Sequence, residues 1–411
     1  MLKLDLIHTL AFAGVVLFLG YGIRRLVRPL ARFNIPAPVI GGLLAAVVIT
    51  VARTQGAELV QFDTTLQSPL MIAFFTTIGF GASVPLLKSG GPQVLLFFVI
   101  ASIFAIAQNV LGAVVAGGMG MHPLFGVLAG SVTLTGGPAT GLAFAPQFEA
   151  AGVPAAASVA VAAAMVGIIS GGLIGGPIGT WLVERHRLRS AVAGGGAPVE
   201  PRRADNIVED RMPEPAVHVP EGEDRESYVL LKTVVAILVA MWVGSWVSQG
   251  FASLGVTLPA YIGAMLVAAA IRNFDEATRL VGLSQRTIDD VGGVALSLFI
   301  TMALMTLKLW ELAGLALPLL VILAAQVLLI ALVCLFLIYR LMGRDYDAAV
   351  MSSGFCGFML GTTANAMANM EALAEKYGPA PRAFLVVPMV GAFFIDFTNA
   401  VFITFFLNFF T

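Results

Sequence analysis

The chain has 411 residues and a net charge of −1, with 58% hydrophobic residues, 11% charged residues and a mean hydropathy of +0.93. Soluble domains carry roughly 25% charged residues, so this chain has too few polar side chains to cover a water-facing surface. The composition predicts a polytopic membrane protein, and the near-neutral charge gives no indication of nucleic acid as a partner.

The first apolar run extends from Leu6 to Gly22, and only one Lys and one Asp precede it. It lacks a cleavage site of small residues at its end and continues into Arg24, Arg25 and Arg28. We therefore interpret it as a retained membrane span and not as a signal peptide.

A helix needs about 20 mostly apolar residues to cross the hydrocarbon layer, and by this measure the sequence predicts an all-α protein with ten spans. The spans are 5–23, 36–52, 68–87, 93–117, 155–182, 229–250, 257–271, 289–307, 312–338 and 383–408. Two further apolar stretches, 123–144 and 348–370, are too rich in Gly, Thr and Asn for lipid-facing helices. We expect each to be a re-entrant hairpin that returns to the side from which it entered.

Lys and Arg are enriched in cytoplasmic loops, which allows the orientation to be predicted. With ten crossings and two re-entrant hairpins, the basic residues on the inside are Arg24, Arg25, Arg28, Arg32, Lys88, Arg185, Arg187, Arg189, Arg272, Arg279, Arg286, Arg340, Arg344, Lys376 and Arg382. Those on the outside are Lys3, Arg53 and Lys308. Counting either hairpin as a full crossing would spoil this asymmetry. Both termini are therefore expected to be external.

Residues 186–227 interrupt the apolar composition with five prolines, a GGG string and charges of both signs, and they contain no aromatic residue. Such a composition is typical of a disordered linker, here expected on the cytoplasmic side. It separates an N-terminal half, residues 1–185, from a C-terminal half, residues 228–411. Each half contains five predicted spans and one predicted hairpin.

The two halves are related in sequence. A shift of 224 residues aligns Gly130 with Gly354, Gly137 with Gly361, and the string MVG at 165–167 with MVG at 389–391. The hairpin also precedes the last span in each half. Because five is an odd number, the second half begins on the opposite face of the membrane. The sequence therefore predicts an inverted repeat, which is a recurrent plan of secondary transporters.

The predicted hairpin tips contain LTGGPATG at 134–141 and LGTTANAMAN at 360–369. Non-helical backbone at membrane depth is tolerated where protein or a water-filled cavity satisfies its polar groups. Half-helix N-termini at such tips carry partial positive charge and free N–H groups, which suit an anionic ligand. The candidate substrate-binding residues are Ser131, Thr133, Thr135, Gly136, Gly137, Thr140, Gly361, Thr362, Thr363, Asn365 and Asn369.

The alternative is that these small residues only allow close helix packing. Packing is the interpretation that we favour for the GxxxG ladder of Gly167, Gly171, Gly175 and Gly179. For the two tips we favour ligand binding, because Asn and Pro add nothing to packing.

Asp396 lies near the middle of the last predicted span, where an ionisable side chain is costly and indicates a functional site by default. Asn399 lies on the same helical face at i+3, and Thr398 is close to both. Carboxylate, amide and hydroxyl oxygens suit a small cation such as Na⁺. The candidate ion-binding residues are Asp396, Asn399, Thr398, Asn109 and Gln108. A protonated structural acid and a proton relay are the alternatives for Asp396.

Six stretches resemble the bacterial sodium/glutamate symporter family: IPAPVIGGLLAA, SPLMIAFFTTIGF, LAGSVTLTGGPATG, ALMTLKLWELAGLALP, RDYDAAVMSSGFCGF and FLVVPMVGAFFID. The resemblance covers nearly the whole chain except the linker. It implies Na⁺-coupled uptake of L-glutamate across the bacterial inner membrane, with Na⁺ as coupling ion and no other cofactor. It also implies inverted five-span repeats with two re-entrant loops, a homodimer, and an elevator motion of a hairpin-bearing domain against a dimeric scaffold.

The chain departs from the family in the first hairpin, where GGPATG replaces the usual GGHGTG. Pro138 removes a backbone donor and a titratable side chain. A carrier for another small carboxylate, or one driven by H⁺, is therefore the second hypothesis. An ion channel is a third, although the inverted repeat and the lone acid argue against it. An enzyme is not expected, because the histidines lie at span edges or in loops and no HExxH or GxSxG motif occurs.

Overall fold

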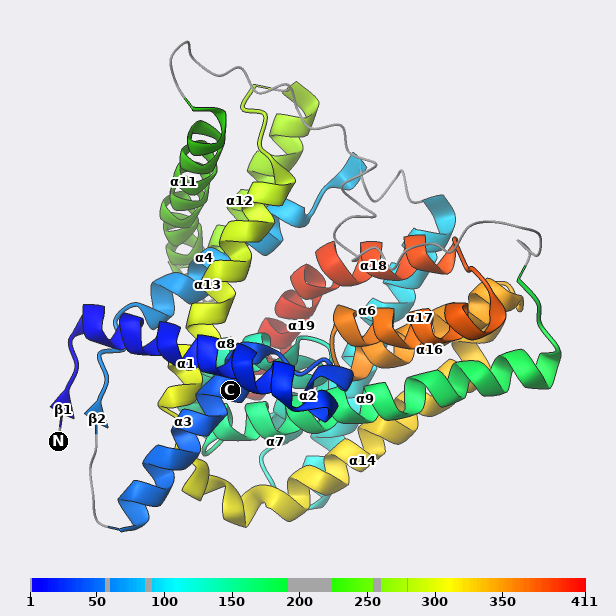
Figure 1. The fold of residues 1–411 in the computed structure, drawn as a ribbon, viewed down its shortest axis with the longest axis horizontal. Coiled ribbons are helices and arrows are strands. Elements are labelled where there is room, and N and C mark those ends of the chain that lie inside the picture. The colour runs from blue at the N-terminus through cyan, green and yellow to red at the C-terminus, as the bar shows by residue number, and fades with distance from the viewer. Residues whose placement is uncertain (1, 56–59, 86–90, 191–223, 254–259, 279) are drawn as a thin grey trace. The chain divides into compact units, whose positions relative to one another are not determined.

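The computed structural model describes residues 2–55, 60–85, 91–190, 224–253, 260–278 and 280–411 (Figure 1). This part of the chain is almost entirely helical. It contains one short pair of parallel strands, β1 (Leu2–Lys3) and β2 (Val60–Gln61). Residues 191–223 of the predicted linker lie outside the described residues.

The chain divides into two compact units that interleave its halves. Unit 1 comprises residues 1–85 and 212–313, and unit 2 comprises residues 86–211 and 314–411. Unit 1 therefore contains the first three predicted spans of each half. Unit 2 contains both predicted hairpins and the last two predicted spans of each half.

Unit 1 is built from long helices. They are α1 (Leu6–Leu26), α2 (Arg28–Arg32), α3 (Ala37–Thr54), α4 (Gln67–Gly81), α11 (Arg225–Ser253), α12 (Ala260–Thr278) and α13 (Gln285–Met305). The 3₁₀ helix η2 (Leu309–Leu315) contains the boundary with unit 2. α1 packs on α3 and α13, whereas α4 packs on α11, α12 and α13.

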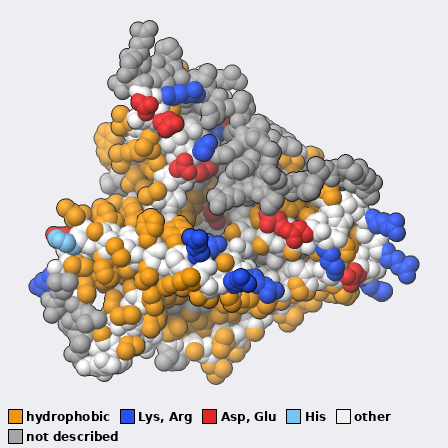
Figure 2. Space-filling model, viewed as in Figure 1, with side chains coloured by type: hydrophobic (Ala, Val, Ile, Leu, Met, Phe, Trp, Pro, Cys, Tyr) orange, Lys and Arg blue, Asp and Glu red, His pale blue; other side chains and the backbone are white. Residues whose placement is uncertain are grey.

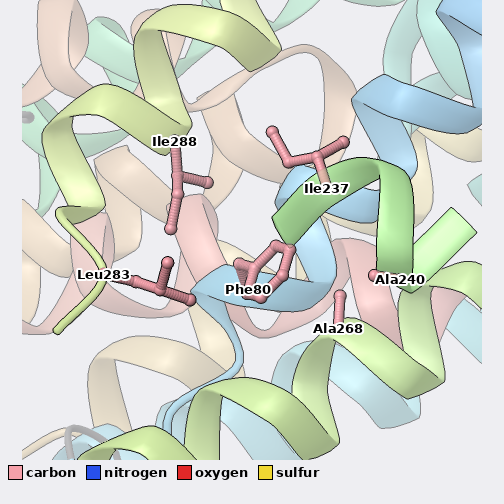
Figure 3. Close-up of a cluster of buried hydrophobic side chains, with 6 residues drawn as sticks. All are labelled: Phe80, Ile237, Ala240, Ala268, Leu283 and Ile288. Atoms are coloured by element: carbon pink, nitrogen blue, oxygen red, sulfur yellow. The ribbon is translucent and has the colours of Figure 1, made fainter. Parts of the chain in front are cut away.

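A cluster of buried hydrophobic side chains joins the second group of these helices (Figure 3). Its members are Phe80 of α4, Ile237 and Ala240 of α11, Ala268 of α12, Leu283 before α13, and Ile288 of α13. Lipid tails are as apolar as these side chains, so burial away from lipid gives little hydrophobic gain. Close packing and dispersion must therefore supply most of the attraction in this cluster.

A buried polar cluster occupies the C-terminal end of α12. The Asp275 carboxylate accepts hydrogen bonds from the backbone N–H groups of Val281, Gly282 and Leu283, at 2.7, 2.9 and 3.0 Å. Arg272 Nε pairs with Glu276 Oε1 at 2.8 Å. These bonds satisfy the backbone of the turn into α13, and they explain why charged residues are tolerated on a largely buried helix.

Unit 2 contains the remaining elements. They are α6 (Gly91–Gly118), α7 (Pro123–Val127), η1 (Leu128–Val132), α8 (Gly137–Ala150), α9 (Ala156–His186), α14 (Ala316–Val333), η3 (Cys334–Ile338), α15 (Tyr339–Leu341), α16 (Tyr346–Leu360), α17 (Thr363–Tyr377), α18 (Ala383–Phe393) and α19 (Ile395–Phe410). η1 and η3 are π-helical. α16 and α17 lie side by side, and both pack on α9 (Figure 1).

Seven of the described helical segments are long and apolar enough to cross a membrane: α1, α3, α6, α9, α11, α13, and the segment 316–341 formed by α14, η3 and α15. The bent pair of α18 and α19 adds an eighth if it counts as one span. The predicted spans 68–87 and 257–271 coincide with α4, which has 15 residues, and with α12, which ends in the polar cluster. The fold thus agrees with a helical polytopic membrane protein, and the number of ten spans stays a prediction.

Large hydrophobic side chains cover much of the visible surface (Figure 2). On α11, for example, Leu231, Trp242 and Trp246 are 63%, 59% and 55% exposed. A water-facing surface rarely carries so continuous an apolar layer. This surface chemistry fits contact with lipid.

The two predicted hairpins are, by contrast, enclosed by protein. Every residue from Ala348 to Leu360 is buried, and so is every residue from Leu124 to Ala145 except the half-buried Gly136. Backbone that leaves a helix within the hydrocarbon layer needs this enclosure, because lipid cannot hydrogen-bond to it.

The glycine ladder of α9 makes the enclosure of the second hairpin possible. A Cβ atom at Gly167 would overlap the Leu360 carbonyl oxygen, and one at Gly171 would lie 3.2 Å from the Leu360 Cβ. Further along the helix, a Cβ at Gly175 would overlap the Asn369 amide of α17, and one at Gly179 would overlap Leu373 of α17 and Ser353 of α16. The expectation that this ladder serves close packing is confirmed.

This packing predicts different effects for two glycines of α9, Gly167 and Gly176. Gly167→Ala should lower the midpoint of thermal unfolding in detergent, because overpacking against a backbone atom costs about 1–3 kcal/mol. Gly176→Ala is the matched control: a Cβ there would meet nothing within 4 Å, so the higher helix propensity of Ala should leave the midpoint unchanged or raise it. Equal midpoints for both variants would contradict the tight contact at Gly167.

Candidate functional site

The first hairpin consists of one arm formed by α7 and η1, a tip at residues 133–136, and a second arm formed by α8. Gly130 interrupts the first arm with non-helical backbone angles, φ −102° and ψ −131°. At the start of α8, Gly137 has φ +68°, a conformation that residues with a Cβ rarely adopt. The sharp turn at this tip therefore depends on Gly137.

Pro138 lies in the first turn of α8. Proline is well tolerated there, because the N–H groups of a first helical turn have no partner within the helix. The departure from the family's usual motif is therefore compatible with the hairpin. Pro138 has no backbone N–H, so the start of α8 offers one N–H donor fewer to a ligand.

The second hairpin consists of α16 and α17, separated by Gly361 and Thr362. Gly361 has φ −154° and ψ −104°, which ends α16. Thr362 is the N-cap of α17, and its hydroxyl accepts a hydrogen bond from the Asn365 N–H at 3.4 Å. The cap satisfies one N–H of the first turn and leaves others available to a ligand.

The two tips meet inside unit 2. A Cβ atom built on Gly137 would lie 3.8 Å from the Gly361 carbonyl oxygen and 3.9 Å from Thr362 Cγ2. The N-termini of α8 and α17 thus converge on one place. No Lys or Arg occurs in either stretch, 123–144 or 348–370. The positive potential at the tips therefore comes from helix dipoles and free N–H groups.

A buried amide on α6 contacts both tips. Gln108 Oε1 accepts a hydrogen bond from Thr135 Oγ1 at 2.8 Å, and Gln108 Nε2 donates one to the Met359 carbonyl at 2.9 Å. Gln326 Nε2 of α14 donates to the Gln108 carbonyl at 2.7 Å. The sequence analysis placed Gln108 among the ion ligands. In the structure, both polar atoms of its amide are engaged by the hairpins.

The next residue on α6 belongs to a second network, which reaches α19. Asn109 Oδ1 accepts from the Ser131 N–H at 2.9 Å. Ser131 Oγ donates to Asn399 Oδ1 at 2.6 Å, and Asn399 Nδ2 donates to the Ser131 carbonyl at 3.0 Å. All three residues are buried. The network therefore joins a candidate substrate residue, Ser131, to two candidate ion residues.

Asp396 lies just after a break in the last predicted span. α18 ends at Phe393, and α19 begins at Ile395 with a bend of 43° between the two helices. The half-buried Asp396 falls in the first turn of α19, where the helix dipole favours a negative charge. Thr398 Oγ1 donates to the Ile395 carbonyl at 3.2 Å. The acid thus lies near the middle of the span at a helix N-terminus, one turn before Asn399.

Most of the remaining candidate residues form hydrogen bonds with other residues of unit 2. Asn365 Nδ2 donates to the Ile168 carbonyl at 2.8 Å, and Asn369 Nδ2 donates to the Gly171 carbonyl at 3.0 Å, so both amides attach the second hairpin to α9. Thr133 Oγ1 donates to the Leu128 carbonyl at 2.8 Å. Thr140, Gly136 and Thr363 also lie near the tips: Thr140 packs under Gly136, and Thr363 faces Gly391 of α18.

Two further participants complete these contacts, the Met359 carbonyl and Gln326, and for Gln326 the sequence favours an interhelical hydrogen bond. Gln326 gave only the general signal of a polar residue in an apolar span, and the Met359 carbonyl gave none, because every residue carries a carbonyl. Their roles depend on which segments lie opposite α6. That arrangement brings together residues 218 and 251 positions apart.

Comparison with known proteins identifies the family. A profile of the family described as Sodium/glutamate symporter matches residues 2–379. The chain belongs to this family. It is 41% identical over 408 residues to the sodium/glutamate symporter of Escherichia coli (strain K12), which covers 99% of this chain and 98% of that protein. It is 38% identical over 397 residues to the sodium/glutamate symporter of Haemophilus influenzae, which covers 96% of this chain and 95% of that protein.

The Ser131–Asn399 contact in this family member can be tested by a double-mutant cycle. Ser131→Ala and Asn399→Ala should each lower the unfolding midpoint, because each leaves a buried polar group without its partner at a cost of about 1–3 kcal/mol. The double variant should lose less than the sum of the two. As a control, Thr404 Oγ1 bonds within α19 to the Ala400 carbonyl, so Thr404→Val combined with Ser131→Ala should be additive. An additive Ser131/Asn399 pair would refute the bond.

Proposed function

We propose that this chain is a secondary active transporter that carries L-glutamate into the bacterial cell together with Na⁺ across the inner membrane. Family membership over nearly the full length supports the reaction. The observation within the structure that carries the proposal is the meeting of the two hairpin tips in one unit. Two opposed re-entrant segments around one site are typical of such carriers.

The substrate would bind where α8 and α17 begin. Glutamate carries two carboxylates, and the two converging helix N-termini offer N–H donors and positive potential without any basic side chain. The Thr362 and Thr363 hydroxyls are half-buried at this place, so they could donate hydrogen bonds. The side-chain amides of Asn365 and Asn369 would support substrate binding indirectly, because they hold α17 against α9.

The coupling ion would bind near Asp396 and Asn399. A carboxylate at a broken span, close to amide, hydroxyl and carbonyl oxygens, is the kind of oxygen-rich environment in which transporters coordinate Na⁺. The network from Asn399 through Ser131 to hairpin 1 gives a physical connection between ion and substrate. Binding of one would therefore favour binding of the other.

An elevator motion would use the division into units. Unit 2 contains every candidate substrate and ion residue, and unit 1 contains none. We infer that unit 2 moves as one body, whereas unit 1 serves as the scaffold and as the contact of a homodimer. The inverted repeat would supply the two related conformations, one open to each side.

The orientation follows from the distribution of basic residues. Both termini would be external, and the 186–227 linker would be cytoplasmic, because Lys and Arg are retained on that side. The domains would then be two inverted repeats, 1–185 and 228–411, joined by that linker.

A different small carboxylate, or H⁺ in place of Na⁺, is the second candidate. Pro138 favours it, because the N-terminus of α8 has one N–H donor fewer than with any other residue at that position. Competition of a panel of small carboxylates with labelled glutamate separates these possibilities. Saturable counterflow would exclude a simple pore.

Asp396→Asn should abolish Na⁺-dependent glutamate uptake into proteoliposomes, because the neutral amide cannot balance the charge of the ion. Glu149→Gln is the matched control: Glu149 is an exposed acid at the end of α8 in the same unit, and its loss should leave uptake unchanged. Size-exclusion profiles of both variants establish folding. Retention of wild-type Na⁺ dependence by Asp396→Asn would remove this carboxylate from the mechanism.

Glutamate should raise the unfolding midpoint of the purified protein more strongly in Na⁺ than in choline, because a ligand stabilises the folded state according to its affinity. At 100 times Kd the stabilisation is about 2.7 kcal/mol. D-glucose provides a control ligand without carboxylates. Equal shifts in Na⁺ and choline would contradict positive coupling between the two sites.

A further inference from the structure

The two hairpin tips have little direct polar contact with each other. Gly137 and Gly361 approach closely but have no side chains. Thr135 Oγ1 lies 3.9 Å from the Met359 sulfur, which is a weak acceptor. A strong connection between the tips therefore has to come from a third element.

Gln108 has the chemistry that such a connection requires. An amide presents one acceptor and one donor group at a fixed separation. Here the acceptor faces a hydroxyl of hairpin 1, Thr135, and the donor faces the Met359 carbonyl of hairpin 2. A carboxylate could serve only the first partner, because it has no proton to donate to the Met359 carbonyl. The residue type thus matches both tips at once.

The position of Gln108 is itself held from a further helix. The Gln326 amide of α14 donates to the Gln108 carbonyl, and both residues have 0% exposure. Because both side chains are fully buried, these bonds are costly to leave unmade. Three separate segments, the two tips and α14, therefore bond to this single residue of α6.

We propose that Gln108 is a positioning residue that couples the two tips, so that a ligand that orders one tip also orders the other. The proposal rests on the proposed function of the tips as the substrate site. A tip already held in its bound conformation has less freedom to lose on binding. Loss of the Gln108 bonds should therefore weaken glutamate binding without removing any group that contacts glutamate.

The first test compares uptake kinetics at saturating Na⁺ in proteoliposomes. Gln108→Leu and Thr135→Val should each raise the KM for glutamate about five- to tenfold, the effect of one buried hydrogen bond. The double variant should have a KM no higher than that of Gln108→Leu, because the bond to Thr135 is already lost. The control Thr404→Val should keep the wild-type KM.

The same variants separate this role from two others. If Gln108 were an ion ligand, Gln108→Leu would raise the Na⁺ concentration for half-maximal uptake, whereas Thr135→Val would leave both that concentration and the KM for glutamate unchanged. If Gln108 only filled space, Gln108→Leu would keep the wild-type KM. Either result, or additive effects in the double variant, overturns the coupling.

The second test needs no substrate and so distinguishes failure of the coupling from failure of the proposed function. Hydrogen exchange is measured by mass spectrometry on the intact protein in nanodiscs. Thr135→Val, a change in hairpin 1, should speed exchange at residues 359–363 of hairpin 2 severalfold, whereas Thr404→Val should not. An unchanged hydrogen-exchange rate at residues 359–363 would refute the coupling. The wild-type protein could instead show no Na⁺-dependent glutamate uptake while Thr135→Val still speeds exchange at residues 359–363. That result would refute only the substrate assignment.

Discussion

The whole of unit 2 depends on one constraint, the need of a broken helix inside the membrane for hydrogen-bond partners that lipid does not offer. Both hairpins leave helical geometry, at Gly130 within the first arm of the first hairpin and at Gly137 and Gly361 beside the two tips. The structure meets the constraint by burying residues 124–135, 137–145 and 348–361 and by bringing side-chain amides to the freed backbone groups. The glycine ladder of α9 serves the same purpose, because it lets the second hairpin pack directly on that helix.

This constraint also divides the polar residues of unit 2 between two tasks. Gln108, Asn109, Asn365 and Asn369 donate or accept within the protein and so stabilise the hairpins. In the proposed function, the N–H groups at the starts of α8 and α17, together with Asp396, interact with ligands. A polar residue at membrane depth is therefore not by itself a ligand contact. Its partners decide which task it has.

The sequence predicts the elements well and their partners poorly. Local composition predicts the limits of α9, the two hairpins and the functional importance of Asp396. Gly and Thr mark the breaks in the helices, and Asp396 is an acid within an apolar run. The bonds of Gln108 to Met359 and Gln326 do not follow, because they depend on segments more than 200 positions away. The interleaving of the halves in two units is hidden for the same reason, since no local pattern encodes which distant spans pack together.

The interleaving has a consequence for biogenesis. Hairpin 1 is synthesised long before the segments that complete its surroundings, because the Met359 carbonyl and Asn399 lie 251 and 268 residues beyond their partners Gln108 and Ser131. In the proposed topology, the nascent N-terminal half would therefore hold in the bilayer a polar loop whose partners Met359 and Asn399 have not yet been synthesised. Unit 2 could then be completed only after the C-terminal helices follow.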